Sequence, residues 1–216
     1  MIQKNDFDVM ISSETPVPNL IVNNIASLLF TRLPHRDEQS ILILTHVDGT
    51  YVEVSLQKLR YITASLYEEF QKKNIRPGDT VLLATLSVNT ELYTILLFTG
   101  LVSYGARVLF PMFVETTELD NWIQNTNCSA VIFPSVEIQN LPGYERQKQV
   151  INDIRRIAEK HQLPLFDTTE DFCLTSLLNK TDLPKEYTTN AHVQACLNTT
   201  DPTTESVIFT TSGTSG

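Results

Sequence analysis

The final six residues of the sequence combine residue types that suit a phosphate-binding loop: Thr211, Ser212, Gly213, Thr214, Ser215 and Gly216. The two glycines allow positive φ angles and a close approach of the backbone to a ligand. Successive backbone N–H groups in such a turn form an anion-binding concavity. The four Ser and Thr hydroxyls add further donors for phosphate oxygens. We therefore predict that this segment binds phosphate.

Two plainer interpretations of the segment are a flexible Ser/Gly linker and a remnant of an expression vector. The segment is not a Walker A loop, because its glycine spacing differs and the lysine of that motif is not present. A GxGxxG fingerprint is also absent from the sequence. A β-branched strand predicted over 206–209 would present the segment at the carboxyl end of a sheet, where open α/β folds bind ligands.

Charge and cysteine content exclude several classes of function. The chain has 16 basic and 25 acidic residues, a net charge of −9, and no basic stripe, which argues against a nucleic-acid partner. The N-terminal residues include acids and no apolar run, unlike a signal peptide. The three cysteines have no CxxC spacing, and the four histidines are scattered, so we expect reduced thiols, a cytoplasmic location and no metal site.

Helical and strand patterns alternate along the chain. Strands are predicted at 41–46, 51–54, 81–86, 107–110, 130–133, 163–166 and 206–209. Amphipathic or apolar helices are predicted at 18–33, from Ser55 through Phe70, from Asn89 to about Tyr104, around 119–123 and around 150–157. On the second of these, Lys58, Glu68, Lys72 and Lys73 are expected to be solvated. The alternation predicts an α/β fold, with a mostly parallel sheet flanked by helices.

The pattern divides the chain into four parts. Residues 1–17 are a polar N-terminal tail, 18–178 an α/β subdomain, and 179–205 a polar connection with a helical turn at 191–197. Residues 206–216 are a strand and the start of the phosphate-binding loop. The uncharged stretch Leu92–Ala106 has 15 residues, fewer than the roughly 20 that span a bilayer, so it predicts a core helix and no transmembrane segment.

The sequence FTTSGTSG at 209–216 resembles the Ser/Thr/Gly phosphate loop of the adenylate-forming, or AMP-binding, ligases. This superfamily includes acyl- and aryl-CoA synthetases, peptide-synthetase adenylation domains and luciferases. The family loop reads roughly T-S-G-T-T-G-x-P-K, and this sequence matches through the second glycine. Upstream segments are similar to family motifs in the expected order: GTY at 49–51, IRPGDTV at 75–81, GLVSYGARVLFP at 100–111, SAVIF at 129–133 and DP at 201–202. The resemblance covers about residues 18–216, with Tyr104 where a small residue is usual.

The resemblance implies the fold of the first subdomain of the N-terminal domain of such ligases. It also implies a reaction of a carboxylic acid with ATP and Mg²⁺ that forms an acyl-adenylate and pyrophosphate. The acyl group then usually passes to a thiol, such as that of coenzyme A or a carrier protein. By carry-over, the loop from Thr211 to Gly216 would contact the β- and γ-phosphates of ATP.

In the family, the loop lysine, the glutamate that helps to hold Mg²⁺, the ribose-binding aspartate and the catalytic lysine all follow this point. The chain is therefore expected to be the N-terminal part of a longer ligase, with no catalytic residue and no activity by itself. Two alternatives stay open: a non-catalytic remnant that acts as an interaction module, and an unrelated α/β domain that binds a small nucleotide. The sequence does not identify the acid, the acyl acceptor or the oligomeric state.

Overall fold

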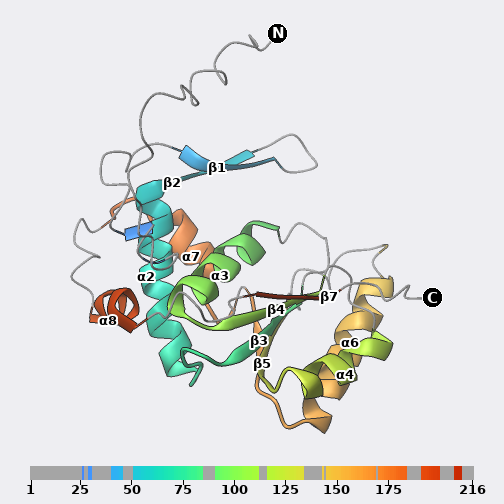
Figure 1. The fold of residues 1–216 in the computed structure, drawn as a ribbon. Helices are drawn as coiled ribbons and strands as arrows, with labels where there is room; N and C mark the ends of the chain where they lie inside the picture. Colours follow the sequence, from blue (N-terminus) through green and yellow to red (C-terminus); the bar gives the residue numbers. More distant parts are fainter. Residues whose placement is uncertain are drawn as a thin grey trace, which may run out of the picture.

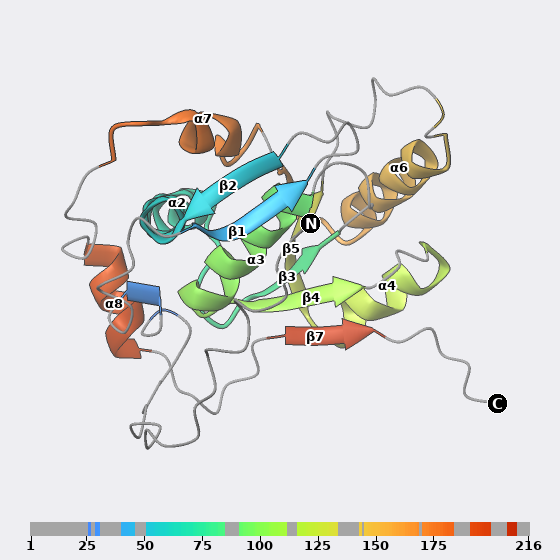
Figure 2. The same ribbon diagram turned by 90° about the horizontal axis from the view of Figure 1, so that it is seen from above.

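Five parallel strands form the main sheet, in the spatial order β6-β5-β3-β4-β7 (Figure 1, Figure 2). They are β3 (Thr80–Leu83), β4 (Arg107–Pro111), β5 (Cys128–Phe133), β6 (Leu165–Asp167) and β7 (Val207–Thr210). The computed structural model describes residues 26, 29–30, 40–45, 51–84, 91–111, 116–133, 143, 145–168, 170–183, 191–199 and 207–210. Within these ranges, the predicted parallel sheet is confirmed.

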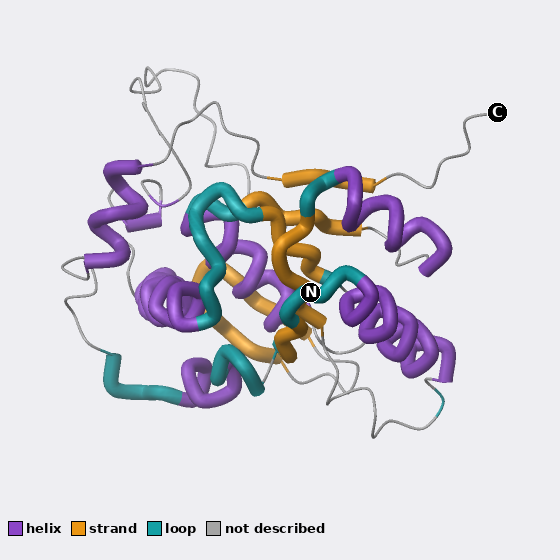
Figure 3. Tube along the Cα trace, turned by 90° about the horizontal axis from the view of Figure 1, so that it is seen from below, coloured by secondary structure: helices purple, strands orange, loops and turns teal. Residues whose placement is uncertain are grey.

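Helices connect the parallel strands and flank the sheet (Figure 3). They are α3 (Glu91–Tyr104) between β3 and β4, α4 (Thr116–Asn125) between β4 and β5, and α6 (Glu145–Lys160) between β5 and β6. Helices α7 (Leu174–Asn179) and α8 (Ala191–Thr199) lie between β6 and β7 in sequence, and α2 (Leu56–Lys72) precedes β3. The sequence pattern did not predict α7, and α8 is longer than the expected helical turn. None of the helices in the described ranges combines the length and apolar character needed to cross a bilayer.

Each central strand sends alternate side chains to two different hydrophobic clusters, as the period of two in a strand requires. Val81, Val108 and Ile132 belong to the cluster formed with α2, α3, α7 and α8. Leu82 and Leu109 belong to the second cluster, formed with α4 and α6. Both faces of the sheet are therefore covered, which explains why β3 is continuously apolar and why all four of its residues are buried.

A separate antiparallel pair, β1 (Ser40–Thr45) and β2 (Tyr51–Ser55), lies apart from the main sheet (Figure 1). The predicted hairpin strands are confirmed, and the Asp48-Gly49 turn lies outside the described residues. The pair packs against the core through the fully buried Val54, while Tyr51 on the opposite face is 62% exposed. The alternation of exposed and buried residues along β2 is typical of a sheet with one solvated face.

Ser55 caps α2 as predicted, because its side chain accepts a hydrogen bond from the backbone N–H of Lys58 at 3.1 Å. The prediction that all four charged residues on this helix are solvated holds for Glu68 and Lys72 and is wrong for Lys58 and Lys73. Their environments come from α7 and the turn before it, which a reading of the local sequence does not reveal.

Lys58 Nζ donates to the carbonyl of Leu178 at 2.8 Å and to that of Lys180, so it caps the C-terminal end of α7. Partial burial lowers the pKa of this amine. Lys73 Nζ pairs with Asp171 at 3.2 Å and lies over the ring of Phe166, 5.1 Å from its centroid. Two lysines therefore tie α2 to the segment that follows β6.

Helix α3 ends at Gly105, whose φ of +93° is the left-handed conformation that glycine adopts readily at a helix C-terminus. Earlier in the same helix, Gly100 faces α2. A Cβ at this position would lie 2.8 Å from Leu66 Cδ1 and 3.4 Å from two ring carbons of Phe70. The absence of a side chain at Gly100 therefore permits the close packing of α2 against α3.

We predict that Gly100→Ala destabilises the fold by about 1–3 kcal/mol, because overpacking outweighs the gain in helix propensity. Urea unfolding followed by circular dichroism measures the change. Thr99→Ala, at the half-buried neighbouring position of the same helix, is the matched control and should change stability much less. Equal stability of Gly100→Ala and the parent chain would contradict the packing argument.

Candidate functional site

The five parallel strands end at one edge of the main sheet, which we call the carboxyl edge, at Leu83, Pro111, Phe133, Asp167 and Thr210. β7 is the neighbour of β4 at this edge, with Phe110 opposite Phe209 and Pro111 opposite Thr210. Thr210 directly precedes the sequence predicted to bind phosphate. All six predicted site residues, 211–216, lie outside the described residues, so their assignment stays a prediction.

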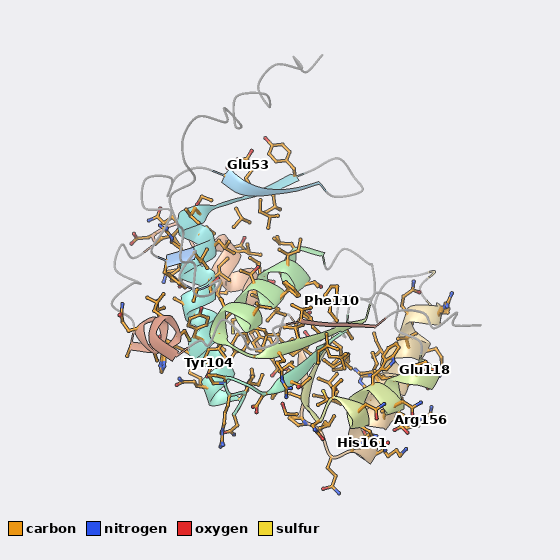
Figure 4. The ribbon with its side chains drawn as sticks, viewed as in Figure 1. Glu53, Tyr104, Phe110, Glu118, Arg156 and His161 are labelled. Atoms are coloured by element: carbon orange, nitrogen blue, oxygen red, sulfur yellow. The ribbon has the colours of Figure 1, made fainter. Side chains whose placement is uncertain are left out.

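Side chains on both faces of the sheet hold β7 beside β4. Val207 packs at the margin of the cluster formed with α2 and α3, and Ile208 at the margin of the opposite cluster. On β4, the ring of Phe110 meets Phe98 of α3 edge-on, with centroids 5.5 Å apart and an interplanar angle of 73° (Figure 4). The strand that precedes the predicted loop is therefore positioned by apolar packing rather than by polar contacts.

A hydrogen-bonded turn follows β6 at the opposite end of the carboxyl edge. Asp167 Oδ1 accepts from the backbone N–H of Glu170 at 3.0 Å, and Asp171 Oδ2 accepts from the N–H of Asp167 at 2.6 Å. The N–H of Thr168 donates to the carbonyl of Phe133 at 3.1 Å, which extends the contact between β5 and β6. Asp167 is buried, and these bonds assign its carboxylate to stabilising the turn.

Arg155 of α6 brings a positive charge to the carboxyl edge, with its guanidinium 5.5 Å from the ring centroid of Phe133. Three strand spacings separate β5 from β7 in the sheet, or about 14 Å, and four separate β6 from β7, or about 19 Å. Neither Arg155 nor Asp167 is therefore adjacent to β7. The sequence analysis did not single out either residue; for Asp167, the available signal was an acid directly after a predicted strand.

Asp120 of α4 joins the C-terminal end of α6 on the far side of the second cluster (Figure 4). Its carboxylate accepts from Lys160 Nζ at 2.7 Å and lies 2.6 Å from His161 Nε2. The hydrogen bond from Lys160 and then that from His161 hold the pKa of Asp120 below its usual value. This cluster links two helices and lies on their exposed side, so we assign it a structural role.

The depressed pKa of Asp120 predicts a stability contribution that is present above the unfolded-state pKa, about 3.9, and is lost as pH falls through the lower folded-state value. Asp120→Asn should therefore lower the melting temperature at pH 7, and the difference from the parent chain should shrink toward pH 3. Thermal unfolding between pH 7 and pH 3 measures this. The control is Glu118→Gln, which alters an exposed carboxylate on the same helix. A difference that does not depend on pH would contradict the ion-pair interpretation.

In the described ranges, no three His, Cys, Asp or Glu side chains gather closely enough to hold a metal ion. The three cysteines are free thiols: Cys128 and Cys196 are buried, and Cys173 is exposed. No described group of side chains has the arrangement of a metal centre.

No protein-family model matches the chain, and no curated protein sequence does. Solved structures do match its fold. A benzoate CoA ligase from Burkholderia xenovorans LB400 aligns with a TM-score of 0.51 and 12% identity, over 75% of this chain and 29% of that one. McyG A-PCP, solved with phenylalanyl-adenylate, aligns with a TM-score of 0.57 and 15% identity, over 89% and 27%.

The fatty acyl-adenylate ligase from L. pneumophila, solved with acyl adenylate and pyrophosphate, aligns with a TM-score of 0.52 and 14% identity, over 76% of this chain and 26% of that one. The chain thus spans less than a third of the length of these structures. At such low identity, the likeness concerns the fold. The α/β fold of this chain is that of the adenylate-forming ligases.

Proposed function

We propose that this chain is the phosphate-binding, N-terminal part of an ATP-dependent carboxylic acid ligase that forms an acyl-adenylate and pyrophosphate. The observation that supports the proposal is the position of β7. It lies in parallel beside β4 in a fold shared with adenylate-forming ligases, and the sequence FTTSGTSG spans its end and continues past it. A Ser/Thr/Gly segment after an apolar strand suits phosphate, because backbone N–H groups and hydroxyls can converge there on anionic oxygens.

In this proposal, the substrate carboxylate attacks the α-phosphate of ATP, and pyrophosphate leaves. The N–H groups and hydroxyls of residues 211–216 hold the β- and γ-phosphate oxygens while negative charge moves onto the leaving group. These donors are neutral, and Mg²⁺ supplies compensating positive charge when it is bound. No described residue is assigned to the metal, since none of them forms a ligand cluster.

We further infer that the acyl group passes to a thiol, of coenzyme A or of a carrier protein. Support comes from the printed identities of the matched structures, among them a benzoate CoA ligase and an adenylate complex of an A-PCP protein. The free thiols fit a reducing compartment, so we propose a cytoplasmic location. The identity of the acid is not assigned.

The first measurement is the intact mass of the native polypeptide in its source cells, compared with 24.4 kDa for this chain. The native polypeptide is then assayed for carboxylic-acid-dependent exchange of labelled pyrophosphate into ATP, across aliphatic and aromatic acids. Exchange that requires an acid supports the ligase. Micromolar nucleotide binding without exchange would favour a nucleotide-binding domain, and neither binding nor exchange would favour an interaction module.

We also predict that the purified 216-residue chain by itself shows no acid-dependent pyrophosphate exchange. The physical reason is that the described part of the chain offers neither a metal-ligand cluster nor a cationic side chain adjacent to β7. The same exchange assay tests this, with the native polypeptide as the positive control. Exchange well above background by the 216-residue chain would overturn the prediction.

A further inference from the structure

Helix α8 is a small element held to the core by few side chains. Of its nine residues, Val193 and Cys196 are buried, whereas Ala191, Gln194 and Ala195 are exposed. By contrast, α2 has nine buried residues. α8 lies beside α2 at the margin of the molecule, away from the main sheet, in both views (Figure 1, Figure 2).

Cys196 is at the centre of this attachment. It is 3% exposed, and its Sγ donates to the carbonyl of Tyr104, the last residue of α3, at 3.7 Å. Tyr104 lies on the side of the molecule where α8 packs (Figure 4). Burial raises the pKa of the Cys196 thiol to about 12, so the docked helix keeps this thiol unreactive.

Elements with little buried apolar surface open locally at a lower free energy than the global unfolding of the domain. We propose that α8 undocks from α2 as a local unit, and that Cys196 is then a thiol-modification site whose adduct holds α8 away from the core. An adduct has this effect because the packed interior around Val193 and Cys196 cannot accommodate the added atoms without strain. The proposal goes beyond the ligase function and does not depend on it.

The chain contains its own controls for this proposal. Cys128 is 8% exposed and, like Cys196, has its pKa raised by burial, but it lies in β5, between β3 and β6. Its thiol should become accessible only when the sheet opens. Cys173 is exposed and should react without any opening. The three thiols therefore distinguish free access, local opening and global unfolding.

The probe is N-ethylmaleimide, added to the full 216-residue chain in native buffer, with each cysteine followed by peptide mass spectrometry. The thiol loses its proton to solvent, and the thiolate sulfur adds to one carbon of the maleimide double bond. The other carbon takes a proton from water, and no group leaves. We expect Cys173 to react first, Cys196 at least about tenfold faster than Cys128, and Cys196 to show a weaker dependence on urea.

Val193→Ala removes half of the buried attachment and should accelerate labelling of Cys196 by about tenfold, with little change at Cys128. Gln194→Ala, on the exposed side of α8, is the matched control and should leave the Cys196 rate within about twofold. After labelling, the parent chain should lose amide protection in α8, whereas Cys196→Ala treated in the same way should not.

Equal rates and equal urea dependence at Cys196 and Cys128 would overturn the proposal, because both thiols would then be exposed only by global unfolding. Unchanged α8 protection in the Cys196 adduct would overturn the second half of it. Loss of ligase activity has no bearing on either result.

Discussion

Replacing Gly213 by valine in the native polypeptide is expected to reduce acid-dependent pyrophosphate exchange by about 100-fold or more. The expectation rests on the proposed phosphate loop. A β-branched side chain at this position would restrict positive φ and keep the backbone N–H groups from approaching the phosphate oxygens. Removing one donor from a comparable preorganised site costs about 100- to 1,000-fold in rate.

Two further variants separate loss of phosphate contacts from loss of structure. Thr214→Ser retains the hydroxyl and should keep most of the exchange activity, whereas Thr214→Ala should lose more. Ser176→Ala, an exposed position on α7, is the surface control and should match the parent protein. Thermal unfolding of each variant checks the fold. Full exchange activity in Gly213→Val, at unchanged stability, would rule out the proposed role of this loop.

Replacing Phe70 by alanine is expected to cost about 3–5 kcal/mol of the free energy of unfolding. Phe70 is fully buried on α2. Its ring centroid lies 5.4 Å from that of Tyr104 on α3 and 5.7 Å from that of Phe172, just before α7. Truncation would remove the central ring of an aromatic cluster that joins three helical segments, and the surrounding elements cannot collapse fully into the space.

Because a loss of this size can unfold a domain of ordinary stability, Phe70→Leu provides the graded variant, with an expected cost of about 1–2 kcal/mol. Tyr51→Ala is the control, because this large side chain is mostly exposed and its truncation should change stability by less than about 0.5 kcal/mol. Urea unfolding at 25 °C gives all three values. A Phe70→Ala protein as stable as Tyr51→Ala would contradict the assignment of this cluster as the main contact between α2, α3 and the segment before α7.

Local sequence signals predicted much of the fold correctly because they act within a few residues. The apolar run in β3 indicated a strand buried on both faces, and all four of its residues are buried. The spacing of Ile151, Ile154 and Ile157 predicted the buried face of α6, and all three are buried. Helix α7 was missed because its six residues hold too few periods of a helical pattern to be recognised.

The sequence alone determined the types of element, their order, and the candidate phosphate segment, because strand and helix periodicity and loop composition are local properties. Only the tertiary structure decided the spatial order of the strands, which puts β7 beside β4 and separates it from Asp167 by the width of the sheet. It also decided which charges are buried. Arg60 is 4% exposed on α2 and donates through Nε to the carbonyl of Leu29 at 2.6 Å, although nothing in its local pattern distinguishes it from a surface arginine. Such burial depends on which distant segment packs over the helix, and that is fixed by the whole chain rather than by neighbouring residues.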